Sequence, residues 1–224
     1  MATLHVLRVF TAADGEWGNP LGVFLEGAEV PEERRQAVAT ELGFSETVFV
    51  DDAGSGAMRI FTPGYELPFA GHPSVGTAWL LARERRPVLA LHPPAGEVAV
   101  RADADLTYIA ARAEWSPPWE LIELADATAV ERHPGPPPEK LLTCCWAWQD
   151  EATGVVRSRC FSLEDGIGED EATGSAAVMM AVALDRSLTI NQGRGSLLQA
   201  TPLGEGRAEV GGRVSLDQVR QFDA

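Results

Sequence analysis

The sequence has few of the features that mark nucleotide, metal or hydrolase chemistry. It contains no glycine-rich loop followed by lysine, no G-x-G-x-x-G pattern after a strand-like segment and no G-x-S-x-G turn, which argues against the nucleotide sites and serine hydrolases that carry these motifs. Three cysteines (Cys144, Cys145, Cys160) and four scattered histidines do not have the spacing of zinc ligands. An odd number of cysteines, two of them adjacent, favours reduced thiols and therefore a cytoplasmic protein without a metal.

Basic residues and long apolar runs are also scarce. Lys and Arg number 18 against 33 Asp and Glu, a formal charge of -15. Such a surface repels phosphate backbones and anionic lipid headgroups, so we expect no nucleic-acid or membrane partner. The longest apolar run, residues 176–184, is far shorter than the roughly 20 residues that span a bilayer. Residues 1–8 do not resemble a signal peptide.

The residue pattern predicts alternating strands and helices. Pro31 and the two glutamates after it are typical of a helix start, and Gly43 of its end. Two further helices, one after Pro73 and one over residues 176–184, are apolar or small on nearly every side, as buried helices are. Alternating apolar residues predict strands at 4–10, 21–25, 47–50 and 58–61.

Three segments recur about 100 residues later in the same order, which indicates a duplication. The pairs are residues 4–7 with 106–109, 59–62 with 159–162, and Ala70 with Ala172. We therefore predict an α+β fold of two similar α/β halves, residues 1–103 and 104–224. Each half would be a mostly antiparallel curved sheet around a buried helix, with the active site in the cleft between them. The proline-rich stretch 133–138 would be a surface loop.

Both buried helices begin at turns of small residues, at Gly71 and at Thr173, Gly174 and Ser175. Open first-turn N–H groups and the helix dipole attract anions, so two such ends facing one cleft could hold a carboxylate. The alternative is ordinary capping of the second helix by Thr173 or Ser175, which is the commoner role of these residues.

Three ionisable residues lie close to these turns. Glu46 interrupts an apolar strand, where burial would raise its pKa toward the range useful for proton transfer; a solvent-facing glutamate is the alternative. His72 precedes Pro73 at a helix start, where capping or packing is the commoner role. Asp170 lies in the acidic stretch 164–171, which could equally be a solvated charge run and does not have the pattern of an EF-hand.

Four blocks, residues 18–24, 43–49, 61–78 and 169–177, are similar to the PhzF-like phenazine-biosynthesis isomerases. The resemblance implies a diaminopimelate-epimerase-like fold, no metal or organic cofactor, and a homodimer. It implies that Glu46 is the glutamate that moves a proton between substrate carbons, with Asp170 and His72 as its catalytic partners. Substrate binding would fall to Gly71, Gly174, Ser175, Thr173 and Asn19.

The epimerases that share this fold use two cysteines, one at each buried helix start, and Ala70 and Ala172 stand at those places. Proton transfer by a pair of cysteines is therefore excluded, which leaves proton transfer by carboxyl groups. We expect a cofactor-independent isomerase acting on a small unsaturated or cyclic carboxylic acid. Glu171, where the family usually has proline, and a shortened stretch at 192–196 favour an alternative, a non-catalytic small-acid-binding or interaction module. A different carboxyl-based isomerisation or epimerisation is a third possibility.

Overall fold

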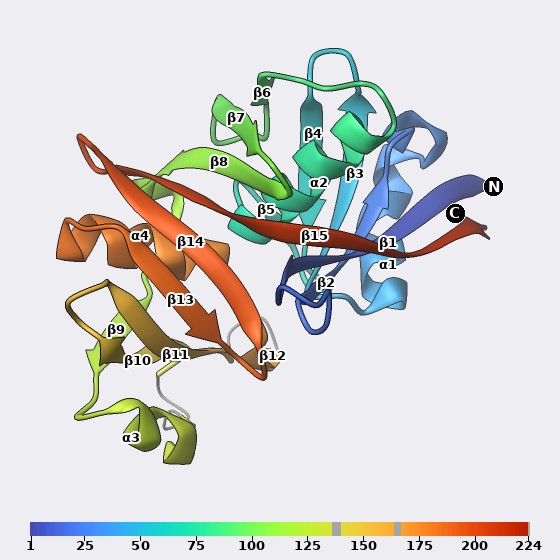
Figure 1. The fold of residues 1–224 in the computed structure, drawn as a ribbon. Coiled ribbons are helices and arrows are strands. Elements are labelled where there is room, and N and C mark those ends of the chain that lie inside the picture. Colours follow the sequence, from blue (N-terminus) through green and yellow to red (C-terminus); the bar gives the residue numbers. More distant parts are fainter. Residues whose placement is uncertain (136–139, 164–166, 224) are drawn as a thin grey trace.

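The computed structural model describes residues 1–135, 140–163 and 167–223, and in this part of the chain fifteen strands join into one sheet (Figure 1). Its path runs β5-β4-β3-β2-β1-β15-β14-β13-β11-β10-β9. The long last strand β15 joins the two halves of the path, because its residues 213–222 pair antiparallel with β1, whereas its residues 207–212 lie between β14 and β8 and pair antiparallel with both. The two termini therefore lie together (Figure 1).

The elements of the first half are, in chain order, β1 (Ala2–Thr11), β2 (Asn19–Phe24), η1 (Gly27–Glu29), α1 (Glu32–Leu42), β3 (Glu46–Asp52), β4 (Ala57–Phe61), β5 (Glu66–Leu67), α2 (Gly71–Arg83), β6 (Ala90–Leu91) and β7 (Val98–Asp103). Those of the second half are β8 (Leu106–Arg112), η2 (Ala113–Trp115), β9 (Glu120–Glu123), α3 (Ala127–Arg132), β10 (Leu142–Asp150), β11 (Val155–Ser162), β12 (Ile167–Asp170), α4 (Gly174–Leu184), β13 (Leu188–Gln192), β14 (Ser196–Gly204) and β15 (Arg207–Phe222).

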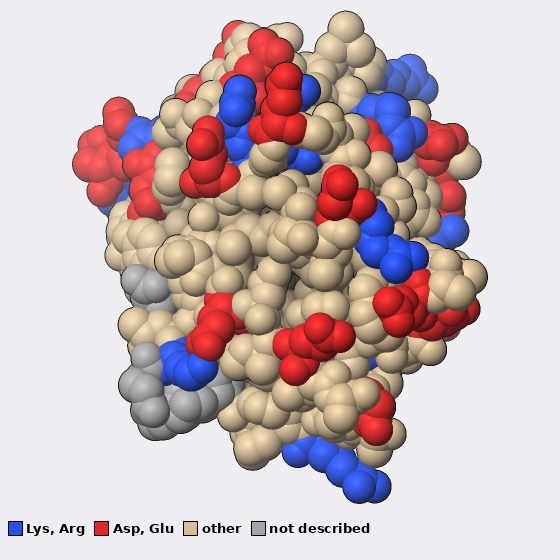
Figure 2. Space-filling view, turned by 90° about the vertical axis from the view of Figure 1, so that its left-hand side faces the viewer, with Lys and Arg blue, Asp and Glu red and all other residues tan. Residues whose placement is uncertain are grey.

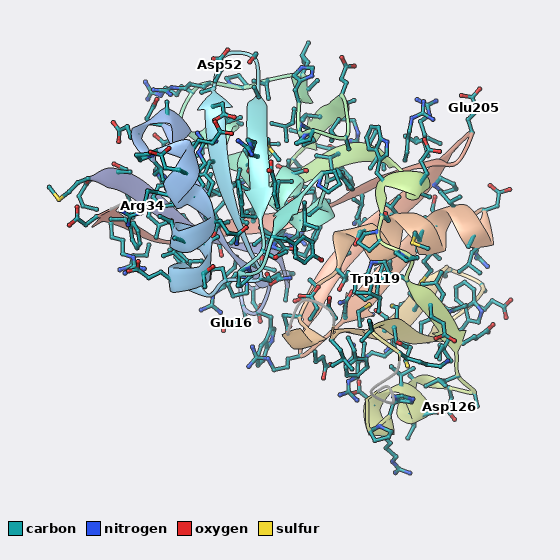
Figure 3. The ribbon with its side chains drawn as sticks, turned by 180° about the vertical axis from the view of Figure 1, so that it is seen from behind. Glu16, Arg34, Asp52, Trp119, Asp126 and Glu205 are labelled. Carbon is teal, nitrogen blue, oxygen red and sulfur yellow. The ribbon has the colours of Figure 1, made fainter. Side chains whose placement is uncertain are left out.

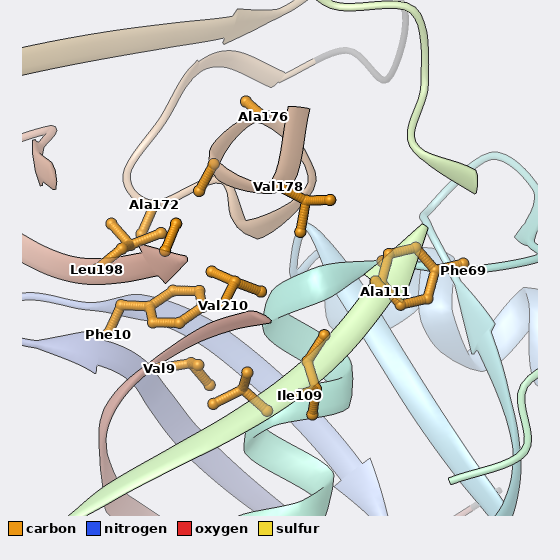
Figure 4. Packing of buried hydrophobic residues seen from close by; sticks show 14 of the residues in the cluster. Val9, Phe10, Phe69, Ile109, Ala111, Ala172, Ala176, Val178, Leu198 and Val210 are labelled. Carbon is orange, nitrogen blue, oxygen red and sulfur yellow. The ribbon is translucent and has the colours of Figure 1, made fainter. Parts of the chain in front are cut away.

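Helices α2 and α4 are buried, as their sequences predict. Helix α2 packs on β1, β2, β8 and β15, whereas α4 packs on β14 and β15. The main core is continuous around both helices, and it brings together apolar side chains from both halves of the chain, including Val9, Ile109, Val178 and Val210 (Figure 4). Burial of these apolar side chains thus helps to hold the two halves together.

Helix α1 lies on a second, smaller core. It begins after Pro31 and ends at Gly43, which has φ 66°, the left-handed conformation that glycine adopts without strain. The helix covers a cluster of aromatic rings in which Phe24 stacks on Phe49 with centroids 5.1 Å apart. The predicted end of this helix is confirmed, and its start differs by one residue because Pro31 is the flanking residue.

The predicted duplication has a counterpart in side-chain contacts. Arg59 donates two hydrogen bonds of 2.6 Å to Glu66, and its guanidinium lies 5.4 Å from the Phe61 ring. In the second half Arg159 donates bonds of 2.7 and 2.6 Å to Glu169 and lies 5.2 Å from the ring of Phe161. The same bidentate ion pair on equivalent strands, β4 and β11, agrees with a common origin of the two segments.

The predicted α+β class is confirmed, and the strands predicted at 4–10, 21–25, 47–50 and 58–61 correspond to β1 to β4. The predicted boundary at residues 103 and 104 falls in the turn between β7 and β8, and it stays a prediction. The stretch 133–138 lies partly outside the described residues. The three cysteines are free and buried. No helix among the described residues has the length and apolarity that a membrane crossing needs.

Candidate active site

The buried helices α2 and α4 meet end to end at two glycines. A Cβ atom on Gly71 would lie 2.8 Å from the backbone of Gly174, and one on Gly174 would lie 3.0 Å from the backbone of Gly71. No real side chain fits such a gap, so glycine is required at both places for the two N-termini to approach. The predicted helix starts therefore lie side by side.

Neither helix start is capped by its own side chain. Ala70 precedes α2 and Thr173 precedes α4, and neither makes a side-chain cap hydrogen bond. The Thr173 hydroxyl bonds Asp170 instead, and Ser175 Oγ accepts a 3.0 Å bond from the indole N–H of Trp119. The capping alternative for Thr173 and Ser175 is therefore wrong, and residues of both first turns line the same cavity.

Asp170 is held from both halves of the chain. Its Oδ1 accepts a 2.7 Å bond from the Asn19 side chain on β2, and its Oδ2 accepts a 2.6 Å bond from the Thr173 hydroxyl. Asn19 also donates to the carbonyl of Ala172 at 2.9 Å and accepts a 3.2 Å bond from Ser45. Asp170 is only 9% exposed, so the alternative of a solvated charge run is wrong for this residue.

Glu46 and His72, from β3 and α2, lie together in the first half's part of the site. Glu46 begins β3 with its side chain 15% exposed, and its Oε2 lies 3.3 Å from Nε2 of the buried His72. The alternative of a solvent-facing glutamate is therefore wrong. A hydrogen bond joins the His72 ring to the backbone of Pro20. Proline has no N–H, so the ring donates this bond to a carbonyl.

Burial shifts the proton affinities of the two enclosed groups in opposite directions. Burial lowers the pKa of His72 to about 4, although the nearby Asp170 charge opposes the shift. Burial raises the pKa of Asp170 to about 6, with a further rise from the Glu46 charge; His72 and the bonds from Thr173 and Asn19 oppose it. His72 is therefore neutral at pH 7, and Asp170 titrates near neutral pH.

These side chains line one cavity, which contains about 460 Å³ of empty space including its open mouth. Residues from both halves contribute to it: Glu46, Leu67, Phe69, Ala70, Gly71, His72, Pro117, Trp119, Ser162, Asp170, Thr173, Gly174 and Ser175. Asn19 lies behind Asp170 rather than on the wall. Of the predicted site residues, all except Asn19 border the cavity, and Asn19 touches one that does.

The sequence did not indicate the apolar wall of the cavity. Trp119 comes from the segment between η2 and β9 and lies beside α4 in Figure 3, where it bonds Ser175. Leu67 and Phe69 come from the chain before α2. A tryptophan in an irregular segment has no periodic pattern around it, so only the folded chain shows where it lies.

Positive charge is absent from the lining residues named above, so an anionic group would meet helix N-termini and neutral donors. On the face shown in Figure 2 acidic residues are spread out, many with a basic residue beside them, rather than gathered in one patch. Among the described residues, no group of three or more His, Cys, Asp or Glu side chains is placed to hold a metal ion.

Comparison with known proteins assigns the family. Residues 7–135 match the model of the phenazine biosynthesis-like protein family, PhzC-PhzF. The chain is 30% identical over 263 residues to the trans-2,3-dihydro-3-hydroxyanthranilate isomerase of Pseudomonas chlororaphis, covering 94% of this chain and 93% of the relative. It is 32% identical over 251 residues to the enzyme of the same name from Pseudomonas fluorescens, covering 89% of each chain.

Solved structures show the same fold. A Bacillus anthracis phenazine biosynthesis protein of the PhzF family matches with a TM-score of 0.79 at 21% identity, over 100% of this chain and 99% of the other. A hydroxyproline epimerase from Agrobacterium vitis matches with a TM-score of 0.63 at 12% identity, over 98% and 91%. The fold is thus the epimerase-like one that the sequence predicts, and the chain belongs to the phenazine biosynthesis-like family as one of its isomerases.

Proposed function

We propose that the protein is a cofactor-independent isomerase in which Glu46 takes a proton from one carbon of a small unsaturated or cyclic carboxylic acid and returns it to another carbon on the same face. The observation that carries the proposal is the pairing of Glu46 with a buried, neutral His72 at 3.3 Å, opposite Asp170 in one cavity. Asp170 and His72 would orient polar groups of the substrate and set the protonation of Glu46.

The hydrogen-bond pattern of His72 explains how Glu46 could hold a proton between the two transfers. The ring is neutral and its N–H is donated to the Pro20 carbonyl, so the nitrogen that faces Glu46 has a lone pair. A protonated Glu46 can donate to this lone pair. After the first transfer the proton would therefore rest on Glu46 with a partner, ready for delivery to the second carbon.

The substrate carboxylate would bind at the paired helix starts. Gly71 and Gly174 line the cavity and carry no side chain that would cover their helix starts, and both helix dipoles have their positive ends there. Leu67, Phe69 and Trp119 present an apolar wall with no acid or base, so one face of a bound ring would meet proton donors and acceptors and the other would not. This supports transfer on a single face.

The relatives named above suggest the first substrate to test, trans-2,3-dihydro-3-hydroxyanthranilate. Turnover in D₂O followed by NMR should place deuterium on a ring carbon with the wild-type protein. Glu46→Gln should lower turnover by roughly 10²–10⁴-fold, the usual contribution of a general acid–base group. Glu41→Gln, on the exposed side of α1, is the matched control and should keep wild-type turnover.

Wild-type turnover by Glu46→Gln would remove the proposed role of this residue. Binding of the acid without deuterium exchange in either protein, across a panel of cyclic and unsaturated acids, would instead support a small-acid-binding module. The absence of a metal, the absence of an organic cofactor, the homodimer and the cytoplasmic location stay predictions. Activity that persists after dialysis against a chelator would support the two absences, and light scattering tests the homodimer.

A further inference from the structure

Gln192 ends strand β13 and lies behind the proposed site rather than in it. It is 2% exposed and uses its whole side-chain amide on the turn that carries Asp170. Its Oε1 accepts a 3.1 Å bond from the backbone N–H of Thr173, and its Nε2 donates bonds of 2.8 Å to the Thr173 hydroxyl and 3.0 Å to the carbonyl of Asp170. Buried polar groups are normally hydrogen-bonded, and because every bond of this amide goes to one turn, the amide holds that turn in place.

The chemistry of these bonds fixes their direction. A backbone N–H can only donate, so the bond from Thr173 identifies the accepting oxygen of Gln192 and places its NH₂ group at the Thr173 hydroxyl. A hydroxyl has one proton, and since that of Thr173 accepts from Gln192, its own proton is free for Asp170 Oδ2. The chain of donors therefore runs one way, from Gln192 through Thr173 to Asp170.

The strand end that carries Gln192 is itself held in place. Arg157 is buried and donates to the carbonyls on either side, 2.9 Å to Asn191 and 2.5 Å to Gly193. Gly193 has φ 59°, and a Cβ there would lie 2.5 Å from the carbonyl of Glu171. The turn after Gln192 thus packs directly on the turn after Asp170, which limits how far Gln192 can move.

We propose that Gln192 is a positioning residue for Asp170, acting through the Thr173 hydroxyl, whose proton it directs to Asp170 Oδ2. The proposal rests on the proposed function, which gives Asp170 its role in the site. With Asn19 donating to Oδ1, the relay occupies one lone pair on each Asp170 oxygen and fixes the rotation of the carboxyl group toward the cavity.

Other groups also face Asp170 and enter any pH dependence. Glu46 on β3 raises the pKa of Asp170 and His72 on α2 lowers it. On β11 the buried thiol of Cys160 interacts with both Thr173 and Asp170, and burial keeps the pKa of that thiol well above its usual range. These three groups are left unchanged in the variants below, so a difference between variants reports the relay.

The test measures the titration of Asp170 directly, from the carboxyl ¹³C shift of aspartate-labelled protein. Thr173→Val removes the hydroxyl at nearly constant shape and should raise the pKa of Asp170 by about one pH unit, since a hydrogen bond to a carboxylate is lost. Gln192→Met leaves the hydroxyl free to turn away and should give a smaller rise in the same direction. Thr173→Ser keeps the hydroxyl and should titrate like wild type.

The double variant Gln192→Met, Thr173→Val decides between a relay and a separate structural effect. A relay predicts that the double variant titrates like Thr173→Val alone, because Gln192 acts through the missing hydroxyl. Gln218→Met, a matched change at an exposed glutamine on β15, should leave the Asp170 titration unchanged. If Gln192→Met does not fold, Gln192→Leu replaces it, since leucine is uncharged and likewise cannot donate to Thr173.

A wild-type Asp170 titration in Gln192→Met together with a lowered melting temperature would overturn the proposal, and so would rises that add in the double variant. The NMR readout needs no turnover, so a failure of the proposed isomerase activity is seen separately, in the D₂O assay with Glu46→Gln. In an active enzyme the acidic limb of the kcat/KM profile should move with the Asp170 titration, and in Gln218→Met the position of that limb should be unchanged.

Discussion

The burial of Asp170 gives the site a cost in stability that depends on pH. Its pKa is about 6 in the folded protein against 3.8 for a free aspartate. The folded state therefore binds the proton more tightly than the unfolded state, so this contribution to stability is fully present below pH 3.8 and is lost as pH rises through 6. At 1.36 kcal/mol per unit of pKa, the ionised form costs about 3 kcal/mol.

Replacing Asp170 by asparagine removes this cost together with the charge. The unfolding free energy of Asp170→Asn minus that of wild type should rise by about 2 kcal/mol between pH 4 and pH 8, most of the full 3 kcal/mol. The amide loses the bond from the Thr173 hydroxyl, but this loss is the same at every pH. His72, whose pKa is lowered, weakens both proteins in acid, so its effect largely cancels in the difference.

Urea unfolding at several pH values between 4 and 8 measures the difference. Asp223→Asn, at an exposed aspartate near the C-terminus, is the control and should differ from wild type by a small, constant amount. A difference for Asp170→Asn that does not change with pH, or that falls as pH rises, would refute the reasoning. A stabilised but inactive variant is the expected pattern for a site that trades stability for chemistry.

Two further substitutions test the helix contact and the apolar wall. Gly174→Ala places a Cβ 3.0 Å from the backbone of Gly71 and should lower the unfolding free energy in urea by about 1–3 kcal/mol. Gly168→Ala is the control, since a Cβ there meets nothing within 4 Å, and it should lower the unfolding free energy far less. Equal losses in the two variants would contradict the contact. Trp119→Phe removes the donor to Ser175 and should lower kcat/KM about tenfold, chiefly through KM, whereas an unchanged KM would argue against that role.

The sequence predicts the elements of the fold better than their arrangement. Gly43 has a local reason to end α1, and the two helices without a polar face must be buried, whatever the rest of the chain does. Strand β15 has a local partner in β14, with which it forms a hairpin that turns at residues 204–207. Its pairings with β8 and β1 join residues some 100 to 200 positions apart, and only the packed structure selects those partners.

The candidate site likewise contains residues that the sequence indicated and residues that it did not. Glu46, His72 and Asp170 stood out because an acid in an apolar strand or a histidine at a helix start conflicts with its surroundings, and such conflicts mark functional positions. Trp119 and Gln192 conflict with nothing nearby in sequence. Their partners, Ser175 and Thr173, lie 56 and 19 residues away, so no local pattern shows what these two side chains bond.

The duplicated strands also show that the ionisable residues of the site are not matched between the two halves. Thr47 pairs with Phe61 in the first half and Thr143 pairs with Phe161 in the second, so the equivalent of Glu46 is Leu142. Gly71 and Gly174 meet at the two helix starts, so Ser175 is the equivalent of His72. This register differs by one residue from the sequence-based pairing of Ala70 with Ala172, because the residues that precede the two helices are Ala70 and Thr173.

The arginine pairs place the last ionisable residue. Glu66 and Glu169 are equivalent because Arg59 and Arg159 hold them in the same way, so the equivalent of Asp170 is Leu67. At each of these three positions only one half has an ionisable side chain, and the other has leucine or serine. A site with two matched bases would suit removal of a proton on one face and its return on the other. Two related halves with a single carboxyl–imidazole pair, Glu46 and His72, instead favour removal and return of the proton on the same face.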